Sequence, residues 1–294
     1  MLAPRHAQRP PRLRARRSRA RVLAAGLLLA GFALATSPAQ AKPLNLRFDS
    51  FYDPDAQALS LVKNKGFERL MTEIGFAMGG RMIGPAQSLG QLGIEGALEL
   101  SVVGVNGDAD YWQDSVREPS SAVRTGQLRV RKGGPFGMQF GAVFTHMFDS
   151  DLYGIGAEVN MSLVDGYNAL PDLALRIDVH TLVGNSNLAM LMQSTNLVIS
   201  KSFGVGGVLS LQPWAAYSFG IVTAGLSEVV IYDENNQDTL DPDPPLRLDQ
   251  VLTYSHRAAF GFRLVVTRVS VGAEFLRSFT DELNNVTLKL GVDF

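Results

Sequence analysis

Arg176, Asp178 and His180 are the residues of this chain whose types and spacing are best suited to chemistry. A guanidinium, a carboxylate and an imidazole stand at every second position, and side chains two residues apart share one face of a β-strand. Such a cluster in a narrow passage could select solutes or transfer protons. The alternative is an ion-paired network that hydrates an interior and holds the surrounding wall in register. This structural interpretation is favoured, because other segments carry similar charges.

Charged residues interrupt apolar segments in the same way along most of the sequence, and we expect them to face one interior. Arg263 between Phe262 and Leu264 is the clearest case, because a charge at such a position in a soluble core would be costly. The expected interior residues are Arg47, Asp49, Glu73, Glu95, Glu99, Arg129, Arg131, Glu158, Arg176, Asp178, His180, Arg257, Arg263, Glu274 and Lys289. Both signs are mixed, so the single-sign ring that usually marks strong ion selectivity cannot be read from the sequence.

Catalysis by an activated nucleophile needs a nucleophile and a base within reach of each other. Ser255 and His256 are adjacent, but neighbours on a strand point to opposite faces, so this pair cannot form a dyad. The chain contains no GxSxG, HExxH or glycine-rich phosphate motif. We therefore expect no catalytic residue, no cofactor and no enzymatic role.

Two acidic stretches are further candidates for a ligand site. Residues 233–243 are rich in oxygen ligands, but they lack the Gly at position six and the Glu at position twelve of an EF-hand calcium loop. A solvated surface loop without a metal is the favoured interpretation. The second stretch, from Asp108 to Glu118, contains Tyr111 and Trp112, which we expect to anchor at a membrane interface rather than to bind a ligand.

Alternation of apolar and polar side chains predicts the elements that carry these residues. Residues 284–294, NNVTLKLGVDF, place five apolar side chains on one face of a strand and polar or small ones on the other. The pattern predicts further strands over 44–52, 73–79, 92–102, 123–131, 136–145, 153–163, 173–180, 190–202, 209–219, 252–266 and 269–279. Gln193 and Thr195 fall on the apolar face of their strand, and Pro213 cannot donate to a ladder, so we expect a bulge at both places.

The first 41 residues have the layout of a secretory signal peptide. Eight arginines precede an apolar run at residues 22–36, and the small residues of Ala39-Gln40-Ala41 follow. The run is shorter than the roughly 20 residues that a membrane-spanning helix needs. Without this segment, 19 Lys and Arg (27 − 8) oppose 28 Asp and Glu, and a net charge of −9 argues against nucleic-acid binding. The chain has no cysteine, which excludes a lipoprotein anchor and disulfides.

A last amphipathic strand that closes on Phe294 resembles the assembly signal of bacterial outer-membrane β-barrel proteins. The resemblance, which is porin-like in pattern, implies an exported chain with a signal peptide over 1–41 and a barrel domain over 42–294. It implies an all-β, antiparallel transmembrane barrel in the outer membrane of a double-membraned bacterium, surrounded by lipid. It also implies that the assembly machinery engages the strand of Phe294. We expect twelve strands, with ten as the alternative, and almost no helix after residue 41.

Strand parity and connection length predict that residues 105–122 and 222–250 face the outside of the cell. A passive channel or transporter for small polar solutes is the favoured function. Several expected inward positions are small and would leave space in the lumen, which argues against a packed plug: Gly75, Gly79, Gly141, Gly154, Gly156, Ser210, Ala259, Gly261 and Gly272. The alternative is a structural or adhesive barrel with a closed lumen that acts through its loops. A lipid-acting enzyme is less favoured, and the sequence indicates neither a solute nor an oligomeric state.

Overall fold

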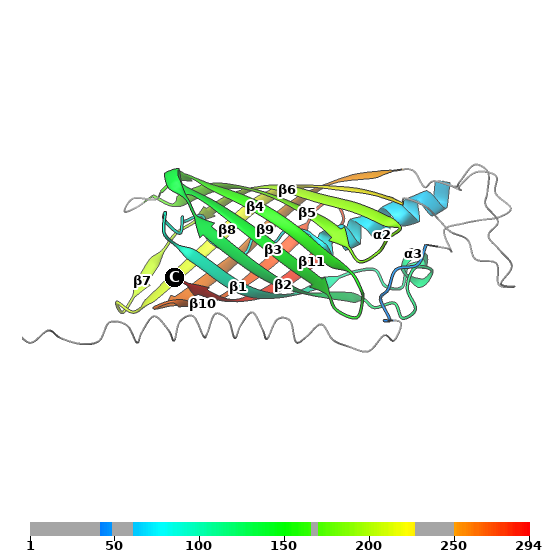
Figure 1. Ribbon diagram of the computed structural model, residues 1–294, viewed down its shortest axis with the longest axis horizontal. Coiled ribbons are helices and arrows are strands. Elements are labelled where there is room, and N and C mark those ends of the chain that lie inside the picture. The colour runs from blue at the N-terminus through cyan, green and yellow to red at the C-terminus, as the bar shows by residue number, and fades with distance from the viewer. Residues whose placement is uncertain (1–41, 49–60, 166–169, 227–249) are drawn as a thin grey trace, which may run out of the picture. The chain divides into compact units, whose positions relative to one another are not determined.

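Ten antiparallel strands close into a barrel in the part of the chain that the computed structural model describes, which is residues 42–48, 61–165, 170–226 and 250–294 (Figure 1). The strands are β1 Ile94–Gly104, β2 Ala122–Gly133, β3 Met138–Met147, β4 Tyr153–Val164, β5 Asp172–Val183, β6 Leu188–Ser200, β8 Leu209–Leu226, β9 Val251–Val266, β10 Val269–Ser278 and β11 Asn284–Asp293. Each pairs with its neighbours in the chain, and β1 pairs with β11 to close the ring. Closure leaves no open edge in the ten-stranded wall.

The strand connections define two ends of the barrel. Residues 105–121, 148–152, 184–187, 227–250 and 279–283 connect strands at one end, called the loop end here. Residues 134–137, 165–171, 201–208 and 267–268 connect them at the other, the turn end. The turn end also holds the start of β1 and the end of β11, because these two strands pair antiparallel with Glu95 opposite Asp293.

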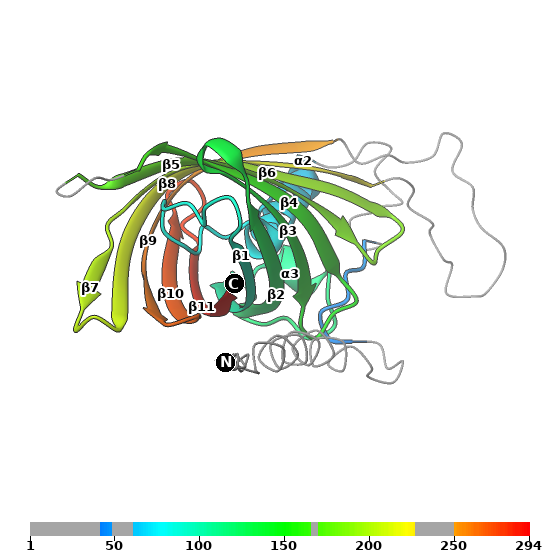
Figure 2. The same cartoon turned by 60° about the vertical axis from the view of Figure 1, so that its left-hand side comes forward.

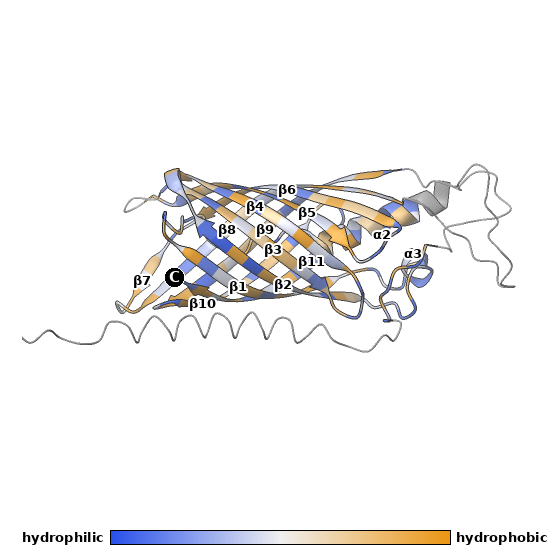
Figure 3. Ribbon diagram, in the orientation of Figure 1, coloured by the Kyte–Doolittle hydropathy of each residue, from blue (hydrophilic) through white to orange (hydrophobic). Residues whose placement is uncertain are grey.

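The outer face of the wall is apolar and the inner face is largely polar. Leu288 is 59% exposed, whereas Thr287 and Lys289 on either side of it are 0% and 4% exposed. The same inversion runs along the other strands, where apolar and polar residues alternate (Figure 3). A wall with apolar side chains outside and charged side chains inside is the pattern of a barrel that faces lipid.

Neither predicted bulge is present. Strand β6 runs in unbroken register with both neighbours, so Gln193 and Thr195 lie on its outer face. Pro213 of β8 stays in register with β9. On its other side, the ladder between β6 and β8 ends at the neighbouring Trp214. Lys201 N donates to Pro213 O at 3.2 Å, and the proline has no N–H to return the bond. The paired chain resumes as the short strand β7, Phe203–Val205, which lies outside the ring. The register instead shifts between Ser162 and Val164 in β4.

The prediction of twelve strands is wrong, because the two segments before β1 do not join the wall. Residues 73–78 of the predicted strand at 73–79 belong to helix α2, Leu61–Met78, which also contradicts the expectation of almost no helix. Residues 44–48 form no strand although they alternate in burial, and their main-chain hydrogen bonds go to loops rather than to a strand; the rest of the predicted strand at 44–52 lies outside the described residues. None of the described helices is long and apolar enough to cross a membrane.

Helix α2 lies inside the ring of strands (Figure 2). It enters at the loop end and ends at Met78, and residues 79–93 continue through the lumen to the turn end, where β1 begins. The short helices α3, Asp110–Gln113, and η2, Pro135–Gly137, lie in connections at opposite ends.

Candidate functional site: a lumen threaded by the chain

The half of the lumen next to the loop end is apolar, and α2 fills it. The helix places Phe67, Leu70, Met71, Ile74 and Met78 inside the barrel, and all five are at most 1% exposed. The apolar residues of the inner wall at this level, called the apolar half, are Val103, Val123, Met147, Leu182, Leu188, Met190, Met192, Val222, Ala224, Leu226, Val251 and Leu276, and small polar residues such as Ser278 and Asn285 lie among them. The two surfaces match in chemistry and belong to one continuous cluster.

Gly75 allows α2 to approach the wall closely. A Cβ atom at this position would lie 2.7 Å from a Val222 methyl group and 3.3 Å from Met190 Cε. The expectation that small residues leave the lumen open is therefore not met. A Cβ atom on Gly154 would lie 3.5 Å from Met78 Cε, and one on Gly261 would overlap the Trp214 ring.

The half of the lumen next to the turn end is lined by paired charges. Its inner wall, called the charged half, consists of Glu95, Glu99, Arg129, Arg131, Glu158, Arg176, Arg263 and Lys289, all at most 8% exposed. The carboxylate of Glu158 is bonded by both Arg129 and Arg131. Arg129 also donates to Glu99 at 2.8 and 3.0 Å. Charges without such partners would be expensive at this depth.

Glu95 lies at the centre of the second group of charges. Its carboxylate is 2.6 Å from Lys289 Nζ, 3.3 Å from Arg131 and 3.5 Å from Arg263. Arg263 is held in turn by Asp293 at 2.6 and 2.7 Å. Residues of opposite sign thus meet across strands β9, β11, β1, β2 and β4, and these ion pairs tie the closing seam between β1 and β11 together.

The charged half also binds the threaded segment, and it does so through main-chain carbonyl groups. Arg176 donates to Met82 O at 2.8 Å. Lys289 and Arg131 both reach Ile83 O, at 3.3 and 3.4 Å. Further donors lie above and below: Gln127 bonds Gly79 O at 3.4 Å, and Gln139 bonds Gln87 O at 3.2 Å. Because carbonyl oxygens are the acceptors, this wall recognises an extended chain largely regardless of its side chains.

Arg81 joins the two halves, and sequence reasoning did not single it out. It is buried, and its guanidinium donates to Phe76 O at 2.7 Å and to Ala77 O at 2.5 Å. A cation there satisfies the last carbonyls of α2 and faces the negative end of the helix dipole. The signal was available in the sequence, because two glycines and an arginine directly follow an apolar run.

The cluster of Arg176, Asp178 and His180 is placed against the threaded segment. Asp178 accepts bonds from Ser194 at 2.6 Å and Asn196 at 2.8 Å, and its other oxygen is 3.4 Å from His180 Nε2. A Cβ atom on Gly80 would overlap that oxygen, so the segment passes close to the wall at this point. These contacts agree with the structural interpretation of the cluster.

Glu73 holds α2 to the long connection between β1 and β2. Its carboxylate accepts hydrogen bonds from Tyr111 Oη at 2.6 Å, Trp112 Nε1 at 2.6 Å and Asn106 N at 3.2 Å. Burial, followed by the bond to Glu73, raises the pKa of Tyr111 and keeps its hydroxyl a donor at neutral pH. The expectation that Tyr111 and Trp112 anchor in a membrane interface is wrong, since Trp112 is fully buried in this contact.

The remaining predicted interior residues divide into those in the wall and those before it. Arg257 and Glu274 are buried on the inner wall, where Arg257 lies 5.0 Å above the Phe76 ring. Neither oxygen of Glu274 has a hydrogen-bond partner in the described structure. Arg47 is exposed at the loop end, so its predicted place in the lumen is wrong, and Asp49 lies outside the described residues, as does the acidic stretch 233–243.

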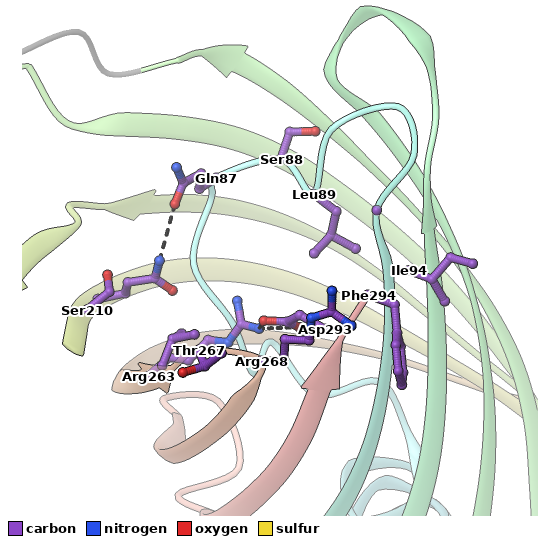
Figure 4. A pocket seen from close by; sticks show the side chains of 13 residues that line it. Gln87, Ser88, Leu89, Ile94, Ser210, Arg263, Thr267, Arg268, Asp293 and Phe294 are labelled. Carbon is purple, nitrogen blue, oxygen red and sulfur yellow. Dashed lines mark hydrogen bonds and ion pairs between the residues drawn. The ribbon is translucent and has the colours of Figure 1, made fainter. Parts of the chain in front are cut away.

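A cavity of about 410 Å³ opens beside the threaded segment at the turn end (Figure 4). Its lining includes Gln87 and Leu89 from the segment and Arg263 and Asp293 from the wall. Gln212 reaches Gln87 at 3.2 Å across one side. Phe294 lies at its rim and closes the seam, because its N–H donates to Ile94 O at 2.8 Å and its carbonyl accepts Ile94 N–H at 3.1 Å.

Ser255 and His256 do not form a dyad. Ser255 is buried while His256 is exposed, so the two lie on opposite faces of β9. Within the described ranges, no group of three or more His, Asp or Glu side chains is placed to hold a metal ion.

The solved structures that this chain resembles are bacterial outer-membrane β-barrels. The β domain of the Bordetella autotransporter BrkA aligns over 69% of this chain and 99% of its own, with 11% identity and a TM-score of 0.34. The KdgM porin aligns over 67% of this chain and 99% of its own, with 6% identity and a TM-score of 0.31. Omp33 of Acinetobacter baumannii aligns over 71% of this chain and 100% of its own, with 10% identity and a TM-score of 0.29. No family model and no curated protein matches the sequence. With scores below 0.5, the architecture rests on the strand register itself.

Proposed function

We propose that this protein is an outer-membrane barrel whose lumen is held closed by its own residues 61–93, and that it acts through its loop end. The apolar outer wall, the predicted signal peptide and the final strand ending at Phe294 support the outer membrane as its location. The proposal adopts the closed-lumen alternative and includes no catalytic role.

The fit of α2 to the apolar half carries this proposal. A lumen lined by Met190, Met192 and Val222 would be a poor path for polar solutes if it were empty, because hydrophobic constrictions exclude water. With α2 in place the apolar surfaces cover each other, and burial of each large apolar side chain contributes about 1.5–3 kcal/mol. We therefore expect the helix to stay bound inside the lumen.

Conductance of the full-length mature protein in a planar bilayer tests the closed state. We expect no stable stepwise current at moderate voltage, because residues 61–93 occupy the lumen from end to end. Reproducible unitary currents from the unmodified protein would contradict the proposal and would restore the passive channel as the favoured function.

The loop end is proposed to face the outside of the cell. It holds the connection 105–121 and the N-terminal residues 42–48, whose Leu44 N donates to Asp149 O at 2.9 Å. An epitope inserted before Lys42 should therefore be labelled on intact cells, whereas one inserted in the turn at 134–137 should be labelled only after permeabilisation. Labelling in the reverse order would invert the orientation.

A gated passage for small polar solutes is the second candidate, and the charged half favours it. The cavity at the turn end is incompletely filled, and Arg263 and Asp293 make part of its lining polar. Passage would require the threaded segment to move. If currents appear only after a trigger, R176E should change their ion selectivity; currents that R176E leaves unchanged would argue against this candidate.

Lipid and the barrel-assembly machinery are the proposed partners. Deletion of Phe294 should slow assembly and leave protein in the periplasm, because it removes both the final aromatic residue and two seam bonds to Ile94.

A further inference from the structure

The outer face of β6 carries polar side chains at the centre of the strand, where most other wall strands are apolar. Gln193 and Thr195 are the sixth and eighth residues of this 13-residue strand, and both are exposed. Neither side chain makes a hydrogen bond to another described residue. Because β6 keeps its register, no bulge turns these residues inward.

The middle of every other wall strand presents a different surface to the outside. The outward residues nearest the strand centres are Leu100, Leu128, Ala142, Val159, Ile177, Tyr217, Ala258, Ala273 and Leu288. Only Tyr217 in this series has a polar group, and it lies on β8, which is paired with β6. The polar exception is therefore one local region of the wall.

Neighbouring strands extend the region. Thr195 pairs with Phe219, and Phe219 pairs with His256 on β9. Tyr217 Oη and His256 Nδ1 are 2.6 Å apart on the same outer face. Gln193, Thr195, Tyr217 and His256, called the β6 patch here, thus lie on one outer face of β6, β8 and β9, with Phe219 between Thr195 and His256.

We propose that the β6 patch is the contact surface for a second copy of this chain in the membrane. The inference rests on the proposed outer-membrane location, because only there does the middle of β6 face hydrocarbon. An amide in hydrocarbon without a partner loses its hydrogen bonds to water and gains none in return. A protein partner with donors and acceptors at the same depth removes that cost.

The chemistry of the patch favours a second copy over another protein. A glutamine amide both donates and accepts, so two Gln193 side chains related by a twofold axis can bond each other reciprocally. No Asp, Glu, Lys or Arg is part of the patch, so two copies meet without the repulsion that like formal charges would cause. Ala189 and Ala215, exposed on the same strands, allow close approach of the two walls.

The absence of cysteine from the chain makes directed cross-linking a clean test. Leu191 is outward on β6 and next to the intact Gln193 on the same face. In native membranes, oxidised L191C should give a disulfide-linked dimer. V159C on β4 and L288C on β11, which are also outward and near mid-strand, serve as matched controls and should stay monomeric.

The second variant tests the amide itself. In the L191C background, Q193L should weaken self-association by about tenfold, the scale of a hydrogen bond between membrane segments, whereas Q193N should retain much of it. Equal cross-linking of L191C and the two control variants would overturn the proposal, as would an unchanged dimer fraction in Q193L. A disulfide between L191C and a different protein, without the homodimer, would assign the patch to another partner.

The location is measured in the same samples. Recovery of L191C in outer-membrane fractions, with the heat-modifiable migration of a folded barrel, shows whether the chain is inserted independently of whether it dimerises. A soluble chain would refute the proposed function, whereas an inserted monomer would refute only this inference.

Discussion

The two halves of the lumen hold the same threaded chain by opposite means. In the apolar half, side chains of α2 such as Ile74 and Met71 are buried in one cluster with wall residues such as Met190 and Val222, so the identity of each side chain matters. In the charged half, wall cations such as Arg176 bind carbonyl groups, which every residue possesses. The difference shows that specificity for this segment resides near the loop end.

The halves also differ in what removal of one group leaves behind. Loss of an apolar contact leaves a cavity, whose cost depends on how far the neighbours relax. Loss of one charge in a buried network leaves its partners uncompensated, which is more costly than the net contribution of the pair. The comparison can therefore be tested with one substitution on each side.

A charge in the apolar half should have the largest effect. I74D places a carboxylate where Ile74 is 0% exposed and removes a buried aliphatic group, which alone costs about 2–5 kcal/mol. We expect α2 to leave the lumen while the wall stays folded, because the strand ladder does not depend on it. Planar-bilayer recordings should then show stepwise currents that the unmodified protein lacks.

The matched variant for this position is I74V. It removes one methylene group, which typically costs 0.5–1.5 kcal/mol, and it should stay closed. If I74D gives no currents although it assembles normally in the membrane, α2 is not what closes the barrel. Currents from I74V as well would mean that α2 is held far more weakly than its burial implies.

Neutralisation of the central carboxylate in the charged half should have an intermediate effect. E158Q keeps the size of the side chain but leaves Arg129 and Arg131 without their shared partner. Breaking a buried ion pair in this way costs about 3–5 kcal/mol at most, and here Glu99 and Glu95 retain part of the interaction. The urea midpoint of unfolding in lipid vesicles should fall, and the barrel should stay closed.

E158Q distinguishes a loss of stability, measured as the urea midpoint, from a loss of closure, measured as current. A lowered midpoint without currents places closure in the apolar half. Currents from E158Q comparable to those of I74D would show instead that both halves are needed to retain the segment, and an unchanged midpoint would show that the ion pairs contribute nothing net.

The ten wall strands could be predicted from the sequence because lipid and lumen impose opposite chemistry on alternate residues. The pattern failed at 73–79, where Ile74, Phe76 and Met78 alternate with glycine and glutamate over a stretch too short to distinguish strand from helix. The longer spacing of Phe67, Leu70, Met71 and Ile74, at i, i+3, i+4 and i+7, is helical. Reading those residues together would have identified α2.

The site itself was predictable only in part. Arg129, Glu158 and Lys289 follow from alternation, since a charge between apolar neighbours must face the lumen of a barrel. What they bind does not follow, because the contacts join residues far apart in the chain, such as Lys289 and Ile83. The same holds for Glu73, whose partners Tyr111 and Trp112 sit in a connection that no periodic pattern describes.

A third region, outside both halves, should give the smallest effect. Asp151 fixes residues 42–48 to the loop end: its carboxylate is 2.8 Å from Lys42 Nζ and 2.7 Å from Asn45 Nδ2. The bond from Lys42, followed by that from Asn45, lowers the pKa of Asp151 below its ordinary value of 3.8.

The direction of that pKa shift determines the expected pH dependence. A carboxyl whose pKa is lowered by folding stabilises the attached state at pH values above its ordinary pKa, and the contribution is lost as pH falls through the lowered value. Hydrogen exchange of residues 42–48 should therefore be constant from neutral pH down to about pH 4, once corrected for the intrinsic pH dependence of exchange, and should rise below it. Because Asp151 is half exposed, the effect should stay within about 1 kcal/mol.

D151N should show the faster exchange already at neutral pH and no further change on acidification. Exchange in D151N that matches the unmodified protein would mean that the loops alone hold this segment, and closure by α2 should be unaffected in either case.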